Sequence, residues 1–337
     1  MQYLYTFLLF LLLQAAQSQD LQFAQFYAVP MFVNAAATGH LEEGSQRITI
    51  AYRGQWDQAS AAGPYQGALA AYEYRHCQKH NFWALGGWLQ SEGARFANYR
   101  QGQVKLSGAF HYQLGQDFYA SVGLGGGALQ YGAALSDLRY DAQFAPGQGY
   151  DPHLATGENL EASNTRWQPD LNTGAQIYNP RQGWVFGAAL SHLNRPNFSI
   201  LGKDNFLGVG LSVHGTATIR TTSRQAFVLR GLTYRQSVLG SNSAQWQTLL
   251  GGFYRMTSRG EGLFSAGCLL RLSGNTGRHG PFEALVPTVQ LGAKQLRFGL
   301  SYDLNLRKLV SPSLGRVELT MGWTFGEVSH CVVCSEF

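Results

Sequence analysis

The chain of 337 residues contains few charged residues. Asp, Glu, Lys and Arg make up 13% of it, whereas about 25% is usual for a globular domain. Hydrophobic residues make up 45%, so the chain has too few ions to cover an ordinary water-exposed surface. The net charge of +5 is small and dispersed, which argues against the basic patch of a nucleic-acid-binding protein.

Long internal apolar runs are also absent. No internal segment approaches the roughly 20 apolar residues of a membrane-spanning helix, and the mean hydropathy is only −0.16. The chain is instead rich in glycine (41), phenylalanine (20) and tyrosine (17). A closed β-barrel is the remaining way to place apolar surface in lipid, because every backbone amide then pairs with a neighbouring strand.

Motifs for catalysis are lacking as well. Ser191-His192 suggests a hydrolase, but neighbours on a strand face opposite sides and no G-x-S-x-G elbow occurs. We therefore expect His192 to be structural. The glycines of 123–127 are not followed by the Lys-Ser/Thr of a phosphate-binding loop, and small residues that let a strand curve explain them better. We expect no enzyme activity and no cofactor.

The four cysteines do not form a disulfide framework. Cys331 and Cys334 have the C-x-x-C spacing of redox and metal sites, and His330 is adjacent, but no second pair accompanies them. Cys77 and Cys268 are isolated in the sequence. A disulfide or an inert tail is favoured over a metal site.

The first 18 residues have the pattern of a cleavable signal peptide. Residues 7–13 form an apolar core, and Ala16-Gln17-Ser18 is a small-x-small cleavage site, although no Lys or Arg precedes the core. The core is too short to span a membrane as a helix. An N-terminal anchor is the alternative.

From residue 46 to 326 the chain alternates between apolar and polar residues in runs of about ten. In one run Phe298 and Leu300 share a parity, while Gly299 and Ser301 share the other. Because successive side chains face opposite sides of a strand, we expect the first set to contact lipid. Arginine should then be costly at Leu300 and mild at Ser301. The opposite parity is polar, small and weakly charged, which suits a lumen.

The runs predict an all-β fold, a transmembrane antiparallel β-barrel of about 14 strands with long outer loops. The expected strands are 46–55, 65–75, 81–91, 101–113, 117–131, 166–178, 183–194, 206–219, 226–237, 244–257, 261–273, 282–292, 294–305 and 315–326. Connections after odd strands are the longer ones, as on the outer side of a bacterial barrel. The longest, 132–165, is expected to have no secondary structure of its own and to lie on the cell surface.

The chain is thus divided into a signal peptide (1–18), an N-terminal periplasmic or lumenal segment (19–45), a barrel (46–326) and a tail (327–337). The segment 19–45 is too apolar for a free tail, with Phe23, Phe26, Tyr27 and Phe32 among its residues. We expect it to pack in the lumen or across the periplasmic mouth, with Pro30 and Asn34 making turns. A disordered leader is the alternative.

The sequence resembles a known family at several motifs. Residues 19–34 read QDLQFAQFYAVPMFVN, Tyr52-Arg53-Gly54-Gln55-Trp56 follows the first strand, and PDLNTG and GAALSHLNRP occur at 169–174 and 187–196. These motifs, in this order, are similar to those of the PorP/SprF family. Val29 and Ala35 depart from the residues that are usual there.

The resemblance implies an outer-membrane component of the type IX secretion and gliding machinery of Bacteroidetes. Its implied partners are other secretion-system proteins and a secreted adhesin-like cargo. Our candidate partner-contact residues come from the two N-terminal motifs: Phe23, Gln25, Tyr27, Pro30, Asn34, Tyr52, Arg53, Gln55 and Trp56. A porin-like channel or transporter for small solutes is the alternative function. A lumen filled by protein favours the secretion component, and a continuous aqueous channel favours the porin-like function.

Overall fold

The computed structural model describes residues 23–55, 65–78, 81–94, 99–133, 139–145, 149–157, 166–197, 206–238, 244–258, 262–274, 281–306 and 315–327. The signal peptide expected at 1–18, the candidate residue Trp56 and the C-x-x-C of Cys331 and Cys334 lie outside these ranges. Cys268 is free and exposed. Cys77, although isolated in the sequence, is disulfide-bonded.

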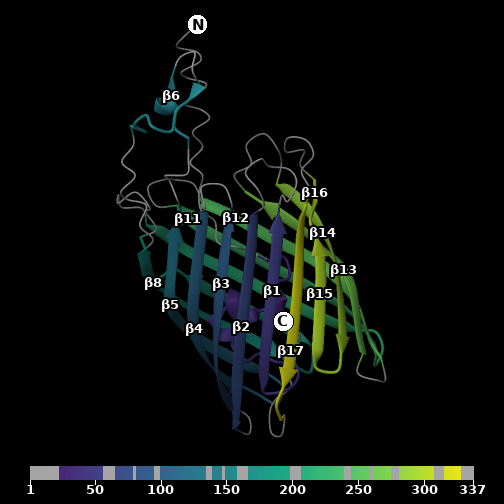
Figure 1. Ribbon diagram of the computed structural model, residues 1–337. Helices are drawn as coiled ribbons and strands as arrows, with labels where there is room; N and C mark the ends of the chain where they lie inside the picture. The colour runs from purple at the N-terminus through teal and green to yellow at the C-terminus, as the bar shows by residue number, and fades with distance from the viewer. Residues whose placement is uncertain are drawn as a thin grey trace.

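Within the described residues, antiparallel strands form one closed barrel (Figure 1). Each strand pairs with the next along the chain, and the first pairs with the last, so that Ile50 lies opposite Met321. The barrel has 14 strands when the two parts β15 and β16 are taken as one. They are β1 (Gln46–Gln55), β2 (Tyr65–Gln78), β3 (Asn81–Ala94), β4 (Tyr99–Gln113), β5 (Tyr119–Gly132), β8 (Arg166–Asn179), β9 (Trp184–Ser191), β10 (Leu207–Arg220), β11 (Gln225–Val238), β12 (Ala244–Thr257), β13 (Gly262–Ser273), β14 (Phe282–Ala293), β15 (Leu296–Tyr302) with β16 (Leu304–Asn305), and β17 (Arg316–Phe325).

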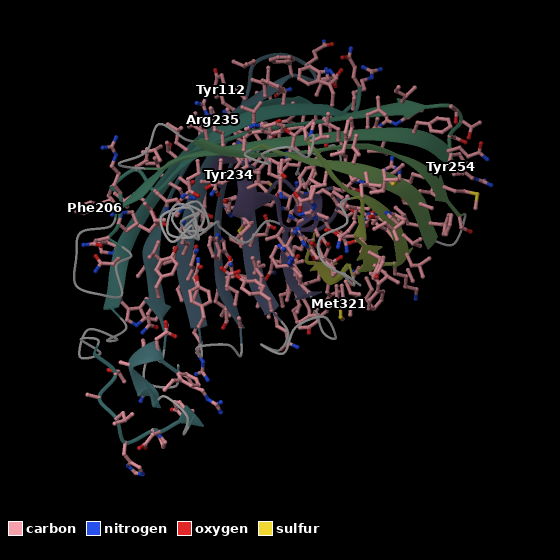
Figure 2. The ribbon with its side chains drawn as sticks, turned by 90° about the horizontal axis from the view of Figure 1, so that it is seen from above. Tyr112, Phe206, Tyr234, Arg235, Tyr254 and Met321 are labelled. Atoms are coloured by element: carbon pink, nitrogen blue, oxygen red, sulfur yellow. The ribbon has the colours of Figure 1, made fainter. Side chains whose placement is uncertain are left out.

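The two faces of the barrel wall differ as the sequence parity predicts. Leu300 is 52% exposed on the outer face, whereas its neighbour Ser301 is 1% exposed on the inner one. A view onto one end of the barrel shows Tyr234 directed into the interior and Arg235 away from it (Figure 2). An outer face of large apolar side chains is what a lipid bilayer requires of a barrel. The predicted transmembrane barrel is therefore confirmed.

Every strand end lies within three residues of its expected position, and β2 and β3 each run three residues further than expected. Three other features differ from the prediction. Strand β9 stops at Ser191 rather than at 194, because His192 (φ 55°) and Arg195 (φ 48°) adopt left-handed conformations that leave the sheet. The strand expected at 294–305 is interrupted at Asp303. The loop 132–165 has secondary structure of its own, namely the 3₁₀ turn η5 (Asp141–Gln143) and a small hairpin of β6 (Phe144–Ala145) and β7 (Gly149–Tyr150).

The two ends of the barrel differ in their connections. The hairpin β6–β7 stands above one end, and the short turns lie at the other (Figure 1). The short turns include 114–118, 180–183 and 294–295. Because short turns face the periplasm in outer-membrane barrels, we expect that end to be the periplasmic one. Among the described residues, no helix is long and apolar enough to cross a membrane.

Candidate functional site

Residues 23–45, here called the lumenal segment, lie inside the barrel (Figure 1). The segment folds into three short turns, η1 (Phe26–Ala28), α2 (Pro30–Val33) and η2 (Ala35–Ala37). Pro30 suits the first position of α2 because a proline there gives up an N–H that would have no helical partner. Every residue from 23 to 41 is buried or half-buried. The segment therefore fills part of the lumen.

The first anchor of the lumenal segment is Gln25. Its Nε2 donates to Ser301 Oγ (3.2 Å) and to the Glu318 backbone oxygen (3.2 Å), and its Oε1 accepts from Thr320 Oγ1 (2.8 Å). The backbone N–H groups of Ala24 and Gln25 donate to Glu318 Oε2 at 2.7 and 3.2 Å. Hydrogen bonds to a charged acceptor are stronger than neutral ones. This end of the segment is thus held by β15 and β17.

The second anchor is Asn34, on the opposite wall. Its Nδ2 donates to the backbone oxygens of Ala175 (3.1 Å) and Ala188 (3.4 Å) and lies 2.9 Å from His214 Nε2. Its Oδ1 accepts from the backbone N–H of Ala36 (2.9 Å) and so also caps η2. One buried amide thus joins the lumenal segment to β8, β9 and β10.

The third anchor comprises Thr38 and Gly39. The Thr38 hydroxyl lies 2.7 Å from Ser107 Oγ, and its carbonyl lies 2.9 Å from His111 Nε2. The backbone N–H of Gly39, where φ is 75°, donates to Glu73 Oε2 at 2.8 Å. Taken together, the anchors and the bond from Ser121 to Ala36 link the segment to eight strands: β2, β4, β5, β8, β9, β10, β15 and β17.

Two inner-face glycines allow the segment to approach the wall. A Cβ added at Gly123 would come well within 3.0 Å of the Ala35 carbonyl and the Ala36 nitrogen, and one at Gly174 would overlap the Asn34 side chain. Real Cβ atoms essentially never show such contacts. We had explained Gly123 by strand curvature; the structure shows instead that its missing side chain leaves room for the lumenal segment.

Aromatic side chains of the segment pack against the wall. Phe32 meets Trp88 edge-on with ring centroids 4.9 Å apart, and Tyr27 meets Phe253 at 5.8 Å. The guanidinium of Arg230 lies 3.9 Å from the centre of the Tyr27 ring. An arginine over an aromatic face gains an electrostatic attraction in addition to contact area. The barrel wall thus covers aromatic side chains that would otherwise be exposed to water.

The inner face is more charged than we expected. Lys105 and Asp170 form an ion pair of 2.6 Å, and Arg271 and Asp303 one of 3.0 Å. All four side chains are almost fully buried. The expectation of a weakly charged lumen is therefore wrong. On β5 the inner face carries small residues such as Ser121 and Gly123, and this strand does not represent the others.

The same burial changes the expectation for Ser301. It is in contact with Gln25 rather than with open water, so an arginine there would displace the lumenal segment and would not be mild. Polar character alone does not identify a tolerant position when the lumen is filled.

The neighbours Ser191 and His192 do not form a catalytic pair. His192 leaves the strand and is buried, with its Nδ1 3.0 Å from Asp170 Oδ1. Because His192 lies outside the strand, the two faces of β9 do not separate it from Ser191. Even so, the Ser191 hydroxyl has no hydrogen-bond partner, so no base activates it. No group of three or more potential metal ligands occurs among the described residues.

The candidate contact residues fall into three groups. Phe23, Gln25, Tyr27, Pro30 and Asn34 are all buried within the lumenal segment. Arg53 and Gln55 are buried at the outer end of β1, where Arg53 Nη2 donates to Gln55 Oε1 (2.9 Å), while Tyr52 is on the outward face. A role for any of them in partner contact stays a prediction.

Sequence reasoning missed the wall residues that receive the segment. Glu318, His111 and His214 are polar residues on inner-facing parity and buried. The signal that could have marked them is a large polar residue among small ones on that parity. Their partners could not be found in this way, because Ala24 and Glu318 are 294 positions apart.

Comparison with known families decides the identity. Residues 15–323 match the family described as type IX secretion system membrane protein PorP/SprF. The chain belongs to this family. The match spans nearly the whole barrel and confirms the resemblance seen in the N-terminal motifs, and with the barrel it places the protein in the outer membrane. A search of curated proteins finds no match.

Solved structures show the same kind of fold at low sequence identity. A deletion mutant (ΔS2S3) of the monoaromatic hydrocarbon channel TodX is similar with a TM-score of 0.53 and 10% identity over 88% of this chain and 94% of that one. The ΔS2 mutant of TodX is similar with a TM-score of 0.52 and 10% identity, over 88% of this chain and 92% of that one. The monoaromatic hydrocarbon channel CymD is similar with a TM-score of 0.50 and 12% identity, over 89% of this chain and 93% of that one. These likenesses show the barrel fold alone.

Proposed function

We propose that this barrel works in type IX secretion as a closed component that binds protein partners and does not conduct small solutes. The observation that carries the proposal is the lumenal segment, which is anchored to eight strands by hydrogen bonds. A channel would have to break these anchors to open a path. We propose no catalytic role.

The partners fitting this role are other secretion-system subunits on the periplasmic side and a secreted adhesin-like cargo. The hairpin β6–β7 supports contact on the outer side, because it extends a structured surface beyond the barrel end (Figure 1). Within it Phe144 packs against Tyr150, with ring centroids 5.5 Å apart. Phe144 is nevertheless 49% exposed. An exposed aromatic on an ordered loop is a common feature of protein-binding surfaces.

The second candidate is a channel for small solutes. It is suggested by the hydrocarbon channels among the similar folds. In buried ion pairs such as Lys105 with Asp170, the two charges contact each other and are shielded from water. In a porin constriction, opposed rows of charges face the water of the channel instead. This difference supports the closed component.

The proposal is tested by conductance and secretion together. The purified protein in planar bilayers should show little stable conductance, and deletion of residues 19–40 should open a pore. The same deletion in cells should reduce the amount of type IX cargo in the culture medium, because the partner-binding form is lost. Large steady channels from the intact protein, with secretion unaffected when the gene is removed, would support the solute channel instead.

A further inference from the structure

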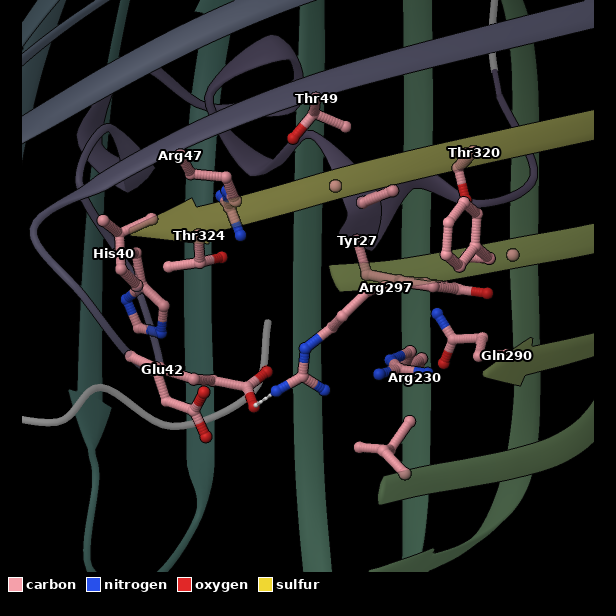
Figure 3. A pocket seen from close by; sticks show the side chains of 17 residues that line it. Tyr27, His40, Glu42, Arg47, Thr49, Arg230, Gln290, Arg297, Thr320 and Thr324 are labelled. Carbon is pink, nitrogen blue, oxygen red and sulfur yellow. Dashed lines mark hydrogen bonds and ion pairs between the residues drawn. The ribbon is translucent and has the colours of Figure 1, made fainter. Parts of the chain in front are cut away.

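At the periplasmic end, a cavity of about 80 Å³ lies between the lumenal segment and the barrel wall (Figure 3). Residues 41–43 form one side, and β1, β11, β13, β14, β15 and β17 form the other. A single water needs roughly 10–15 Å³ of such space. The cavity therefore has room for several waters or for one carboxylate group with its hydration.

The cavity is lined by three arginines and by the carboxylates of Glu42 and Glu43. Arg47, Arg230 and Arg297 line it, and Arg297 Nη2 lies 3.1 Å from Glu42 Oε2 (Figure 3). Burial by itself would raise the pKa of Glu42, but the charges of these arginines and of Arg255 hold the pKa below its usual value. Glu42 is therefore ionised at neutral pH.

Two other arginines of the cavity also contact groups besides Glu42. Arg47 donates to Glu73 Oε1 from Nε (2.9 Å) and Nη2 (2.6 Å). Arg230 lies over the Tyr27 ring. The ion pair between Arg297 and Glu42 is partly open to solvent, because both side chains are about one-third exposed. A partly exposed pair of this kind contributes little net free energy, so another carboxylate can replace Glu42.

We propose that this cavity receives an acidic side chain of a periplasmic protein partner, and that Glu42 occupies it when the partner is absent. The inference rests on the proposed function and names the partner's chemistry. The incoming carboxylate pairs with Arg297, whose planar guanidinium can hold both oxygens. Glu42 then moves into solvent beside Glu43, which is already exposed.

A protein carboxylate fits this site better than a lipid phosphate. The lining side chains of Arg230, Gln290 and Arg297 alternate with outward-facing neighbours such as Leu229, Val289 and Phe298, so they face the lumen and not the bilayer. A headgroup at the membrane surface would have to leave the bilayer to reach them. A flexible peptide in the periplasm meets no such barrier.

The test uses the full-length protein in detergent and a peptide probe, acetyl-tetraglutamate amide, with acetyl-tetraglutamine amide as the neutral control. Titration calorimetry should show binding of the acidic peptide only, and weaker binding at higher salt. Arg297→Gln should lower the affinity about tenfold or more. Glu42→Gln should raise it about threefold or more, because it removes the internal competitor. Arg224→Gln, at an exposed short turn of the same end, should change little.

The Glu42 variant separates a binding site from a merely structural ion pair. If the pair only holds the lumenal segment, Glu42→Gln leaves the peptide affinity unchanged or lowers it, and the inference is overturned. Equal binding of the glutamine peptide, or of inorganic phosphate at the same concentration, overturns it as well. Bilayer conductance of the same samples keeps the two proposals apart: a closed barrel that binds no peptide refutes this inference alone, whereas an intact protein that conducts refutes the proposed function.

Discussion

Replacing Gly123 by alanine should loosen the lumenal segment from the barrel wall. The new Cβ would meet the backbone of Ala35 and Ala36 at less than 3.0 Å, and backbone atoms cannot rotate out of the way as a flexible side chain can. Overpacking of this kind costs about 1–3 kcal/mol. The segment must move, and this strains the hydrogen bond from Ser121 Oγ to the Ala36 oxygen (2.8 Å), which adds about 1 kcal/mol.

The cost falls on the docked state, because a methyl group at Gly123 meets no obstacle once the segment has moved away. A total of about 2–4 kcal/mol corresponds to a shift of roughly 30-fold to several-hundred-fold in the docking equilibrium. In planar bilayers, the fraction of time in which Gly123→Ala conducts should rise by a factor of this order over the intact protein. Heat-dependent gel mobility checks that the barrel itself is folded.

Gly215→Ala is the matched control. Gly215 lies on β10 with outward parity, and the nearest atoms to its added Cβ, in Phe186 and Val185, are at an ordinary 3.5 Å. It should remain as closed as the intact protein. If Gly123→Ala conducts no more often than Gly215→Ala, the close approach at Gly123 does not hold the lumen closed, and the reasoning fails.

Three further predictions follow from the same structure. Leu300→Arg should destabilise the folded barrel in lipid by about 2–4 kcal/mol, since it lies near the middle of its strand, whereas Leu306→Arg at the strand end should cost about 0–1 kcal/mol; equal urea midpoints would contradict this. Asn34→Ala removes two or three buried hydrogen bonds, so it should weaken the docking of the lumenal segment by about 2–3 kcal/mol and increase the conductance. A variant with the same low conductance as the intact protein would disprove this. Protease added to intact cells should cut within 132–165 and spare 179–182; cleavage only after the outer membrane is permeabilised would mean that the topology is inverted.

The strands could be predicted because their determinants are local. Alternation with period two and turn residues between runs are properties of neighbouring residues, and they placed β12 at 244–257 without error. The early end of β9 could not be predicted, because the left-handed conformation of His192 depends on its contact with Asp170, 22 positions away. Local patterns do not carry such pairings.

The candidate site shows the same limit. The apolar character of 19–45 was enough to suggest a lumenal position, since a free segment with so many aromatics would be costly in water. Which wall residues receive it was not readable, because Gln25 and Asn34 each bind strands more than 130 positions away. The inner charges were misjudged for a related reason. Arg271 and Asp303 neutralise each other across neighbouring parts of the wall, and each looks isolated in the sequence.

The anchors also define how the lumenal segment can leave its position. Its C-terminal end continues directly into β1 at Gln46, so that end stays at the wall even when the segment is displaced. Among the described residues, the end at Ala24 and Gln25 is held by hydrogen bonds to Ser301, Glu318 and Thr320 of β15 and β17. If the segment is displaced, we expect release to begin at Gln25 and the chain to turn about residues 39–44, where Gly39 and Gly44 both have positive φ. Glu42 lies within residues 39–44, so the peptide-binding and conductance measurements address opposite ends of the lumenal segment.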